Sequence, residues 1–553
     1  MSKFAATSNR RTHRPALLTL PEAKWLLGLF VAALILWGVS LGNLPLRDWD
    51  EGYYAIVARE MYRTGNWLYP TYLGEPFLLK PPLMQWLVAF SYQLGGVREF
   101  TTRLPPALLS ACGVPLLYLI GKEVFLKRLP AVFAALIYLT LLPVVRHGRL
   151  AMLDGMAISF FLLLLLCLLK SRQDRRWAIG IGISLGLIAL TKGMLVLLLG
   201  AIAGAFLLAD RRLAVLSNPY FWIGMLLGNV PVLAWYAAQW QHYGANFLQV
   251  HFQAQGLERV STSVEGHDGP PWYYLLELLK YTWPWLLFWP RGLYLAWQQR
   301  HTTWGCLVLI GTVGYLGTVS VMGTKLPWYV MPLYPFFALA AAASIAHFLK
   351  TRKRYPRILV AFLGFLAVAG VGGCVYFILA EPQLALIIMG AVVALTMGVS
   401  AWQAKRNNPT FIPILFLGMY LALGLFMTSK SWIWELNEAF PVKPVAALIR
   451  EQTAPRAVVY TSFAYGRPSL DFYSDRLVIP ANAPALKQLW ATQHYLLLDQ
   501  STLAALQLPD SVSLGTAEGF TLVAPKTKAR VALKRSPSRH PVVSFFSYAP
   551  STF

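Results

Sequence analysis

Charged residues are scarce in this chain. Of its 553 residues only 13% are Asp, Glu, Lys or Arg, whereas 57% are hydrophobic. A soluble domain carries about 25% charged residues, and half that fraction, spread over several hundred residues, cannot cover a globule with polar surface. The composition therefore excludes an ordinary soluble protein and indicates a chain surrounded largely by lipid.

Acidic residues and cysteines are also few. The 24 acidic residues stand against 48 Lys and Arg, which gives a formal net charge of +24. Most of the basic residues lie in short clusters between apolar runs, as in the cytoplasmic loops of membrane proteins, so we expect no nucleic-acid partner. All four cysteines fall inside apolar runs without a CxxC spacing, which indicates neither a disulfide framework nor a metal site.

Long apolar runs are abundant. A bilayer core about 30 Å thick needs about 20 apolar residues per helix, and we predict a mainly α-helical, multi-pass membrane protein with about 13 spans. The predicted spans are Trp25–Leu44, Leu104–Ile120, Pro130–Val145, Gly155–Leu169, Trp177–Leu190, Met194–Ala209, Tyr220–Trp240, Tyr273–Trp297, Trp304–Val321, Trp328–Phe348, Ile358–Leu379, Leu384–Trp402 and Phe411–Met427.

The basic clusters set the predicted orientation. With a cytoplasmic N-terminus, the predicted spans place every basic turn inside, as the positive-inside rule requires, and the C-terminal part outside. These turns are Lys122–Arg128, Lys170–Arg176, Asp210–Arg212, Gln298–His301, Lys350–Arg357 and Gln403–Asn407. The stretch Pro81–Leu94 contains polar residues and is predicted to be an amphipathic helix in the membrane interface rather than a span.

The composition changes after residue 428. Short β-rich runs at Ala457–Phe463, His494–Leu498 and Phe520–Ala524 alternate with helix-like segments at Val442–Gln452 and Ala483–Trp490, which predicts a small α/β domain. The predicted organisation is a transmembrane domain over residues 1–428 with outer loops 45–103 and 241–272, an α/β domain over 429–525 on the outer side, and a disordered basic tail over 526–553.

Carboxylates gather in the first outer loop. The segment Arg47–Met61 reads RDWDEGYYAIVAREM, and its helical spacing places Asp50 and Glu51 near a helix N-terminus, where negative charge is favourable. A helix cap needs one carboxylate, so Asp48, Asp50 and Glu51 together indicate a functional cluster, with ordinary solvated acids as the alternative. Lys80 follows in the same loop.

Cations and a further acid lie in two other outer loops. Arg146 and Arg149, which the positive-inside rule disfavours on this face, are suited to hold phosphate oxygens. Asp154 opens an apolar helix and is either an N-cap or an acid of the site. His267 has carboxylates nearby and is either a solvated residue or a ligand for a divalent metal.

These groups suit an amphiphile with a phosphate head at one membrane surface. Glycosyl transfer from such a donor needs a base if the acceptor is a hydroxyl, and cations or a metal for the departing phosphate. Asp50 and Lys80 fit these two roles, and Lys325 adds another cation on the outer face. A transporter for a lipid-linked saccharide is a second interpretation, for which Glu277 and Lys280 inside a predicted span are the best features, and a non-catalytic envelope scaffold is a third.

An ordered set of short strings runs from about Trp49 to Ser474. It comprises WDEGYYAIVAREM, NW, KPPLMQWL, RLP, LD, HDGPPWYY and KLPWYVMPLYP, followed by PSLDFYS. The set resembles the dolichyl- and polyprenyl-phosphate-sugar glycosyltransferases with the C-type glycosyltransferase fold, and within them the bacterial aminoarabinose lipid A transferases and the protein O-mannosyltransferases. The resemblance implies thirteen spans, a periplasmic C-terminal domain and a site on the periplasmic face of the bacterial inner membrane.

The resemblance also implies an inverting transfer from a polyprenyl-phosphate-sugar donor, such as one carried by undecaprenyl phosphate, to lipid A or another envelope glycan, with a secreted protein as the alternative acceptor. The implied catalytic residues are Asp50, Asp154 and Glu51. The resemblance implies Lys80 as a donor-phosphate contact, Tyr329 as a pocket residue and His267 as a loop ligand, with a metal as one candidate partner. The full set of predicted donor-phosphate contacts is Lys80, Arg149, Arg146, Lys325 and Tyr329, and Tyr53, Tyr54 and Tyr334 are candidates for the acceptor or sugar pocket.

Two positions depart from the aminoarabinose enzymes. Their DExRY motif reads Asp50-Glu51-Gly52-Tyr53-Tyr54 here, and the Glu that usually precedes the Lys-Pro pair is Leu79. Because both positions lie near the phosphates or the metal in the family, the departures bear on the choice of sugar and acceptor more than on glycosyl transfer itself.

Overall fold

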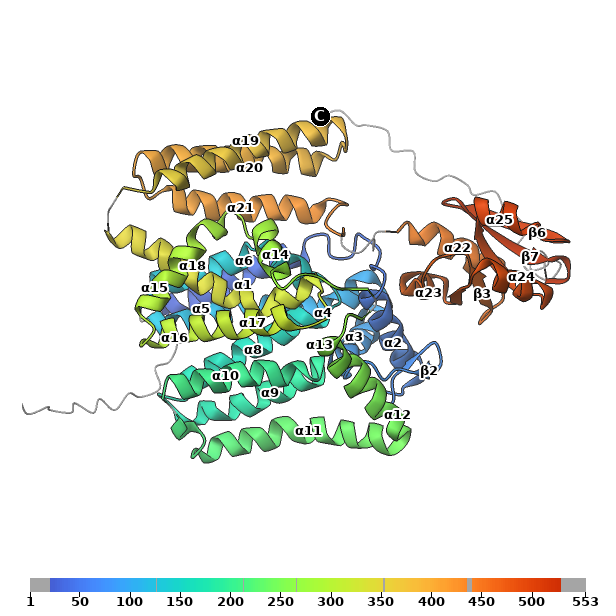
Figure 1. Cartoon of the computed structure of the whole chain (residues 1–553), viewed down its shortest axis with the longest axis horizontal. Coiled ribbons are helices and arrows are strands. Elements are labelled where there is room, and N and C mark those ends of the chain that lie inside the picture. The colour runs from blue at the N-terminus through green and yellow to red at the C-terminus, as the bar shows by residue number, and fades with distance from the viewer. Residues whose placement is uncertain are drawn as a thin grey trace, which may run out of the picture. The chain divides into compact units, whose positions relative to one another are not determined.

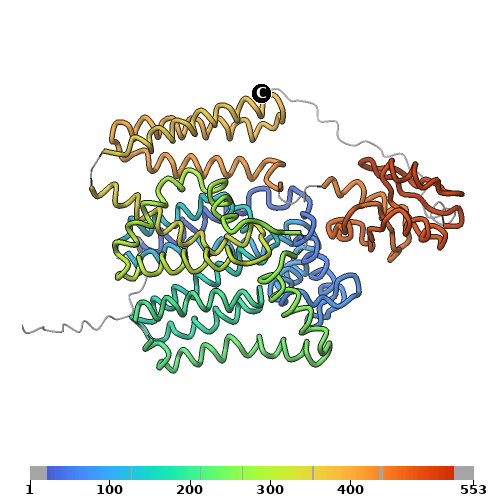
Figure 2. Tube along the Cα trace, viewed as in Figure 1, coloured from blue at the N-terminus to red at the C-terminus, as the bar shows by residue number. Residues whose placement is uncertain are grey.

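The structure is a computed structural model that describes residues 20–125, 127–211, 213–264, 266–351, 354–434 and 440–528. The chain divides into two compact units. The first comprises Met1–Leu44 and Val57–Trp434, and the second comprises Pro45–Ile56 and Glu435–Phe553. Helix α2 (Asp50–Thr64) begins in the second unit and ends in the first. Figures 1 and 2 show the elements of both units.

The first unit is built of helices. Its first half holds α1 (Leu20–Gly38), α3 (Leu83–Gly95), α4 (Glu99–Ala111), α5 (Gly113–Phe125), α6 (Arg128–Leu139), α7 (Leu142–Arg149), α8 (Leu153–Lys170), η1 (Arg175–Trp177), α9 (Ala178–Lys192), α10 (Leu195–Ala209), η2 (Leu213–Val215) and α11 (Pro219–Tyr243), with a hairpin of β1 (Thr71–Tyr72) and β2 (Glu75–Pro76). Its second half holds α12 (Ala245–Leu248), η3 (Gln249–Leu257), α13 (Glu258–Ser261), α14 (Tyr273–Tyr281), η4 (Trp285–Phe288), α15 (Trp289–Gln298), α16 (Thr303–Leu309), η5 (Ile310–Gly314), α17 (Tyr315–Val321), η6 (Pro327–Leu333), α18 (Tyr334–Thr351), α19 (Arg357–Leu379), α20 (Leu384–Lys405) and α21 (Phe411–Thr428).

The prediction of a multi-pass helical membrane protein is confirmed, although the count of spans is lower by length and composition. Among the described residues, eight helices are long and apolar enough to cross a membrane, or nine if α6 and α7, bent by 60°, count as one span. The four other predicted spans are helical in whole or in part. Helix α1 has 19 residues, α9 and α10 have 15 each, and the stretch 273–297 is divided into α14, η4 and α15.

Neighbouring helices in the sequence pack against one another. Helix α9 packs against α8, α10 and α11, and α20 packs between α19 and α21 (Figure 2). Glycines allow the contact between α9 and α11, because a Cβ atom on Gly186 would lie 2.0 Å from the carbonyl oxygen of Gly228. The predicted helix around Pro81–Leu94 exists as α3, which buries one face and exposes Phe90 and Leu94. Its 13 residues are too few to span a bilayer.

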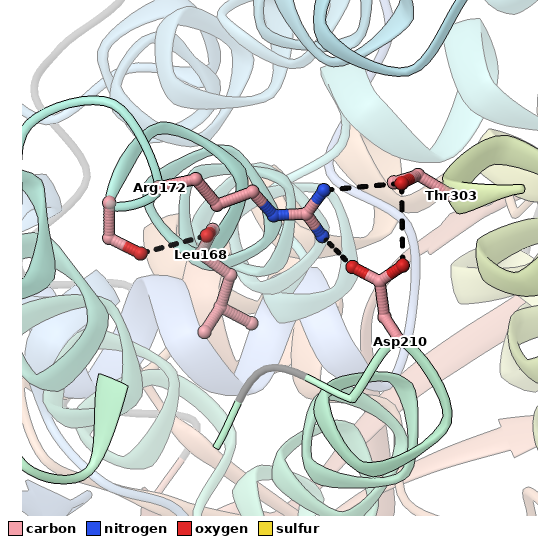
Figure 3. A network of polar contacts seen from close by, with 5 residues as sticks. Leu168, Arg172, Asp210 and Thr303 are labelled. Carbon is pink, nitrogen blue, oxygen red and sulfur yellow. Dashed lines mark hydrogen bonds and ion pairs between the residues drawn. The ribbon is translucent and has the colours of Figure 1, made fainter. Parts of the chain in front are cut away.

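The turns that the sequence predicts to be cytoplasmic meet at one end of the first unit. Arg172, after α8, forms an ion pair with Asp210, after α10, and donates a hydrogen bond to the Thr303 hydroxyl, which itself donates to Asp210 (Figure 3). Similarly, Lys170 forms an ion pair with Glu123 at 2.7 Å. Such pairs join helix ends that the predicted topology places on the same membrane face.

The second unit contains the predicted α/β fold. Its elements after residue 440 are α22 (Val442–Gln452), β3 (Val458–Thr461), α23 (Pro468–Ser474), β4 (Leu477–Pro480), α24 (Ala483–Ala491), β5 (Tyr495–Asp499), α25 (Gln500–Leu506), β6 (Ser511–Ala517) and β7 (Phe520–Pro525). The strand order is β4-β3-β5-β7-β6, in which β3 is parallel to β4 and β5, and β7 is antiparallel to β5 and β6.

The central strand β5 contributes side chains to two hydrophobic cores, one on each face of the sheet. Its alternate residues Tyr495 and Leu497 pack with α22 and α23, whereas Leu496 and Leu498 pack with α24 and α25. A strand buried on both faces has a continuous run of apolar residues, and for this reason β5 could be predicted from the sequence. The predicted disordered tail begins at residue 526, and residues 529–553 lie outside the described part of the chain.

Candidate active site

A cavity of about 510 Å³ opens in the first unit between segments that the sequence assigns to the outer face. Its charged and polar lining comes from six separate places in the chain: the loop before α3, the start of α8, the end of α9, the η3–α13 segment, α17 and η6. The lining residues that bear charge or hydrogen-bonding groups are Lys80, Asp154, Lys192, His251, Gln255, Arg259, Tyr315, Thr318 and Tyr329. The rest of the lining is mostly apolar and includes Leu197, Val260, Val319 and Val321.

Lys80 is held at one side of this cavity by the η3 segment. Its ammonium group donates a hydrogen bond of 2.7 Å to the side-chain oxygen of Gln255. Beside it, His251 contacts the Leu78 carbonyl oxygen through Nδ1 at 3.0 Å and the Tyr236 hydroxyl through Nε2 at 2.9 Å. A carbonyl oxygen can only accept, so Nδ1 carries the proton and Nε2 accepts from the tyrosine.

The charge state of His251 follows from its surroundings. The pKa of His251 is lowered to about 4, mainly by burial and in smaller part by the charge of Lys80, while the hydrogen bond to Leu78 opposes both effects. The imidazole is therefore neutral near pH 7. It serves as a hydrogen-bonding bridge that fixes the backbone two residues before Lys80.

Asp154 and Lys192 form an ion pair in the cavity wall. Asp154 lies in the first turn of α8 and Lys192 in the last turn of α9, so each charge stands at the helix end that favours it, and their charged atoms are 2.5 Å apart. The Lys192 ammonium lies 5.6 Å from the ring centre of Tyr329. Arg259 donates a hydrogen bond of 3.3 Å to the Tyr329 hydroxyl.

The electrostatic balance of the cavity is positive. Three cations, Lys80, Lys192 and Arg259, face one carboxylate, and His251 is neutral. Leu197 and Val321 in the same lining are largely exposed and lie on helices of the membrane unit. A cationic end with apolar, open walls suits an anionic head group that carries a hydrocarbon tail.

The first predicted carboxylate cluster belongs to the second unit. Asp50 is the first residue of α2 and is half-buried. Glu51 is fully buried, and its carboxylate accepts a hydrogen bond of 3.0 Å from the Arg47 amide. Tyr53 is half-buried and Tyr54 is buried.

Asp48 is the most enclosed acid of this loop. It is only 1% exposed and forms an ion pair with Arg467. Burial raises the pKa of Asp48, whereas the hydrogen bond from Ser469 and the charge of Arg467 oppose that rise.

Several predicted phosphate contacts lie outside the cavity lining. Arg146 is fully buried, donates to the Trp432 carbonyl oxygen at 2.8 Å and stacks on Trp434 at 4.0 Å. Arg149 is fully buried as well, lies over the Trp432 ring at 4.5 Å and donates to the Val39 carbonyl oxygen. Both arginines thus anchor the chain that follows α21.

Lys325, Tyr334 and His267 also lie apart from the cavity lining. The buried Lys325 ammonium donates to the carbonyl oxygens of Val319, Ser320 and Met322, at the end of α17. Tyr334 is buried at the start of α18. Around half-buried His267, as elsewhere in the described ranges, no group of three or more His, Cys, Asp or Glu side chains is placed to hold a metal ion. The described residues near His267 therefore do not make up a metal site.

The sequence analysis missed part of the cavity. It did not select Lys192, His251, Gln255 or Arg259 as site residues. A signal existed for Lys192, because it stands between two apolar runs on the outer face, where the positive-inside rule disfavours a lysine. No such signal existed for Gln255, which lies in the π-helix η3 and accepts a hydrogen bond from Lys80, 175 residues earlier in the chain.

The chain is similar in sequence to known glycosyltransferases. A family model described as dolichyl-phosphate-mannose-protein mannosyltransferase matches residues 79–236, the part that supplies Lys80, Asp154 and Lys192. An undecaprenyl phosphate-alpha-4-amino-4-deoxy-L-arabinose arabinosyl transferase of Aeromonas hydrophila is 30% identical over 340 residues, which are 60% of this chain and only 61% of that one. Transferase 1 of the same description from Pseudomonas fluorescens is 30% identical over 372 residues, 65% of this chain and 67% of that one.

A solved structure shares the whole fold. The crystal structure of ArnT from Cupriavidus metallidurans bound to undecaprenyl phosphate is similar with a TM-score of 0.74 at 19% identity, over 91% of this chain and 98% of that one. Its apo state gives a TM-score of 0.75. The protein has the C-type glycosyltransferase fold, and by sequence the chain belongs to the family of the undecaprenyl phosphate-aminoarabinose arabinosyl transferases.

Proposed function

We propose that this chain is a membrane glycosyltransferase that moves a sugar from undecaprenyl phosphate, or a similar polyprenyl-phosphate carrier, to an acceptor in the bacterial envelope. The observation that carries the proposal is the cavity in the first unit. It combines three cations and the Tyr329 hydroxyl with apolar walls, as a lipid-linked phosphate requires.

The donor phosphate lies among Lys80, Arg259 and Lys192 in this proposal. Lys80 donates a hydrogen bond to Gln255, and Arg259 donates one to Tyr329. These contacts hold both cations in the wall of the cavity. Asp154 orients Lys192 through their ion pair, and the isoprenoid tail lies along the exposed apolar wall.

The reaction is a single displacement. The acceptor oxygen forms a bond to the anomeric carbon while the bond from that carbon to the phosphate oxygen breaks, so the configuration is inverted. The departing polyprenyl phosphate takes up a negative charge, which the cavity cations stabilise. Asp50 accepts the proton of a hydroxyl acceptor, whereas for an acceptor that is itself a phosphate it only positions the nucleophile.

The acceptor that we propose is lipid A or another envelope glycan, because the relatives are described as aminoarabinose transferases. A secreted protein is the alternative, favoured by the description of the family model that matches residues 79–236. A transporter role gains nothing from Glu277 and Lys280, whose charges are paired with each other at 3.0 Å.

The proposed topology is thirteen crossings of the bacterial inner membrane, with the N-terminus in the cytoplasm and the C-terminal domain in the periplasm. It is supported by the clustering of the predicted inner turns in ion pairs and by the assembly of the cavity from predicted outer loops. The cavity then opens at the periplasmic face, where the acceptor is found.

Mass spectrometry of lipid A and total envelope glycans tests the proposed function. Cells with and without the gene are compared, and the deletion is complemented by wild type or by Asp50→Asn. We expect one sugar-sized mass to disappear and only wild type to restore it. Unchanged glycans in every strain would contradict a glycan acceptor, and a sugar mass lost from an envelope protein would establish the protein alternative.

A further inference from the structure

The loop that carries Asp50 is packed against one short stretch of the C-terminal domain. Residues 45–56 belong to the same compact unit as that domain. The Leu46 amide donates a hydrogen bond of 2.8 Å to the Tyr473 hydroxyl, and the Trp49 ring stacks on Tyr465 at 5.4 Å. These two contacts hold both sides of Asp48.

Asp48 itself is bound to the start of α23. Its carboxylate forms an ion pair of 2.5 Å with Arg467 and accepts hydrogen bonds from the amide and the hydroxyl of Ser469. Arg467 is enclosed by aromatic rings, with its guanidinium 4.2 Å from the ring centre of Phe440. Asp48 is buried and the Arg467 side chain is 13% exposed, so removing one partner leaves the other charge in a poorly solvated place without its counter-ion.

The backbone around Asp50 is tightly constrained. Trp49, between Asp48 and Asp50, has a φ of +63°, a conformation that is unfavourable for a residue with a side chain. A Cβ atom on Gly52 would lie 2.7 Å from the Ser469 nitrogen, so only glycine permits this approach of α2 to α23. The strained conformation persists because the surrounding contacts hold it.

We propose that Asp48, Arg467 and Ser469 form a clasp through which the C-terminal domain positions Asp50 for glycosyl transfer. The inference rests on the proposed role of Asp50 in that reaction. The three clasp residues do not touch the substrate in this account. They fix the strained Trp49 peptide and, through it, the direction of the Asp50 carboxylate.

Loss of the clasp should lower the turnover number kcat without changing the binding of the lipid donor. The cavity is lined only by residues of the first unit, so loss of the clasp leaves the binding of undecaprenyl phosphate unchanged. The catalytic carboxylate, in contrast, loses its fixed geometry, and misplacement by about 1 Å can cost about 100-fold in rate. We expect Asp48→Asn to lower kcat by roughly 10-fold or more, with the KM for the lipid donor unchanged.

Domain integrity requires a matched control. Asp499 is another carboxylate of the same domain with several hydrogen bonds, from Ser462, Ser501 and the amide of Thr502. These partners all belong to the sheet region rather than to the loop 45–56. Asp499→Asn therefore disturbs the domain without touching the clasp, and its kcat should stay near that of wild type.

The experiment measures kcat, donor KM, undecaprenyl phosphate binding and thermal stability of the full-length protein in lipid nanodiscs. The variants are Asp48→Asn, Ser469→Ala, the double variant Asp48→Asn with Arg467→Gln, Asp499→Asn and Asp50→Asn. Ser469→Ala is the milder probe if Asp48→Asn does not fold. The double variant removes the Arg467 charge that Asp48→Asn leaves unpaired, so thermal stability should recover in part while kcat stays low, because the clasp is still missing.

The outcomes separate the clasp from the proposed function. An active Asp50→Asn contradicts the proposed role of Asp50 itself. An inactive Asp50→Asn with fully active, folded Asp48→Asn and Ser469→Ala overturns the clasp alone. An equal loss of kcat in Asp48→Asn and Asp499→Asn also overturns it, because the effect then comes from the stability of the domain.

Discussion

Replacing Lys80 by methionine removes one cation from the proposed phosphate site while keeping a side chain of similar length. The three cations and one carboxylate of the cavity give a net charge of +2, and the change lowers it to +1. A hydrogen bond between charged groups contributes about 2 kcal/mol, which corresponds to about 30-fold weaker binding of undecaprenyl phosphate. The substitution also removes the hydrogen bond of 2.7 Å that the Lys80 ammonium donates to the Gln255 side-chain oxygen.

The same substitution has a second readout within the protein. The charge of Lys80 adds to the burial that lowers the pKa of His251 to about 4. Without that charge, the pKa of His251 should rise, although burial keeps it below the ordinary value. Titration of the histidine by NMR in nanodiscs, with Tyr236→Phe as a check on the assignment, measures this shift.

Lys280→Met is the matched control for Lys80→Met. Lys280 lies in the same unit, is paired with Glu277 at 3.0 Å and does not line the cavity. Binding of undecaprenyl phosphate, measured by calorimetry at two salt concentrations, should weaken only for Lys80→Met and should lose part of its salt dependence there. Wild-type affinity in Lys80→Met, or an equal loss in Lys280→Met, would refute the assignment of the phosphate site.

Three further predictions follow from other contacts. Tyr329→Phe removes the acceptor of the Arg259 hydrogen bond and should raise the donor KM about fivefold, for a loss of about 1 kcal/mol; an unchanged KM would exclude Tyr329 from the site. Gly186→Ala places a Cβ atom 2.0 Å from the Gly228 carbonyl oxygen and should lower the stability of the protein by about 1–3 kcal/mol, whereas Gly204→Ala, with nothing within 4 Å, should not change the melting temperature. Burial raises the pKa of Asp499, but its hydrogen bonds outweigh that effect and lower the pKa well below the ordinary value. The ionised carboxylate therefore stabilises the fold above about pH 4, and this contribution is lost as the pH falls. Hydrogen exchange of β5 should show the loss of stability at low pH in wild type and not in Asp499→Asn.

The sequence was sufficient for the membrane architecture and for much of the C-terminal domain. Apolar runs of membrane length and the continuous apolar strand β5 can be recognised directly from the order of residues in the sequence. Strands β4 and β6, at the two edges of the sheet, were missed. Strand β4 is apolar but ends at Pro480 after four residues. Strand β6 alternates exposed and half-buried positions, so it lacks the continuous apolar run of a strand buried on both faces.

The site was predictable to the level of loops but not of contacts. Lys80, Asp154 and Tyr329 were selected from three separate loops, and the structure places all of them in one cavity lining. Arg146 and Arg149 were selected by the same reasoning, yet they are buried against Trp432 and Trp434, which follow much later in the chain. Charge patterns identify the face on which a cation lies, whereas the partner that it meets depends on tertiary packing.

Span counting showed a related limit. The predicted span Tyr273–Trp297 is long and apolar, yet the structure divides it into α14, η4 and α15. Prolines at positions 284 and 290 cannot donate the backbone hydrogen bonds of a continuous helix. Hydropathy records the apolar surface of such a segment but not the point where its helix breaks.

The most direct test of the account is sugar transfer in proteoliposomes that contain purified protein, an undecaprenyl phosphate-linked aminoarabinose and lipid A. Product is followed by mass spectrometry for wild type, Lys80→Met and Asp50→Asn. We predict that wild type adds one sugar to lipid A, that Lys80→Met needs more donor to reach the same rate, and that Asp50→Asn gives no product while still binding undecaprenyl phosphate. Full transfer by folded Asp50→Asn would contradict the account.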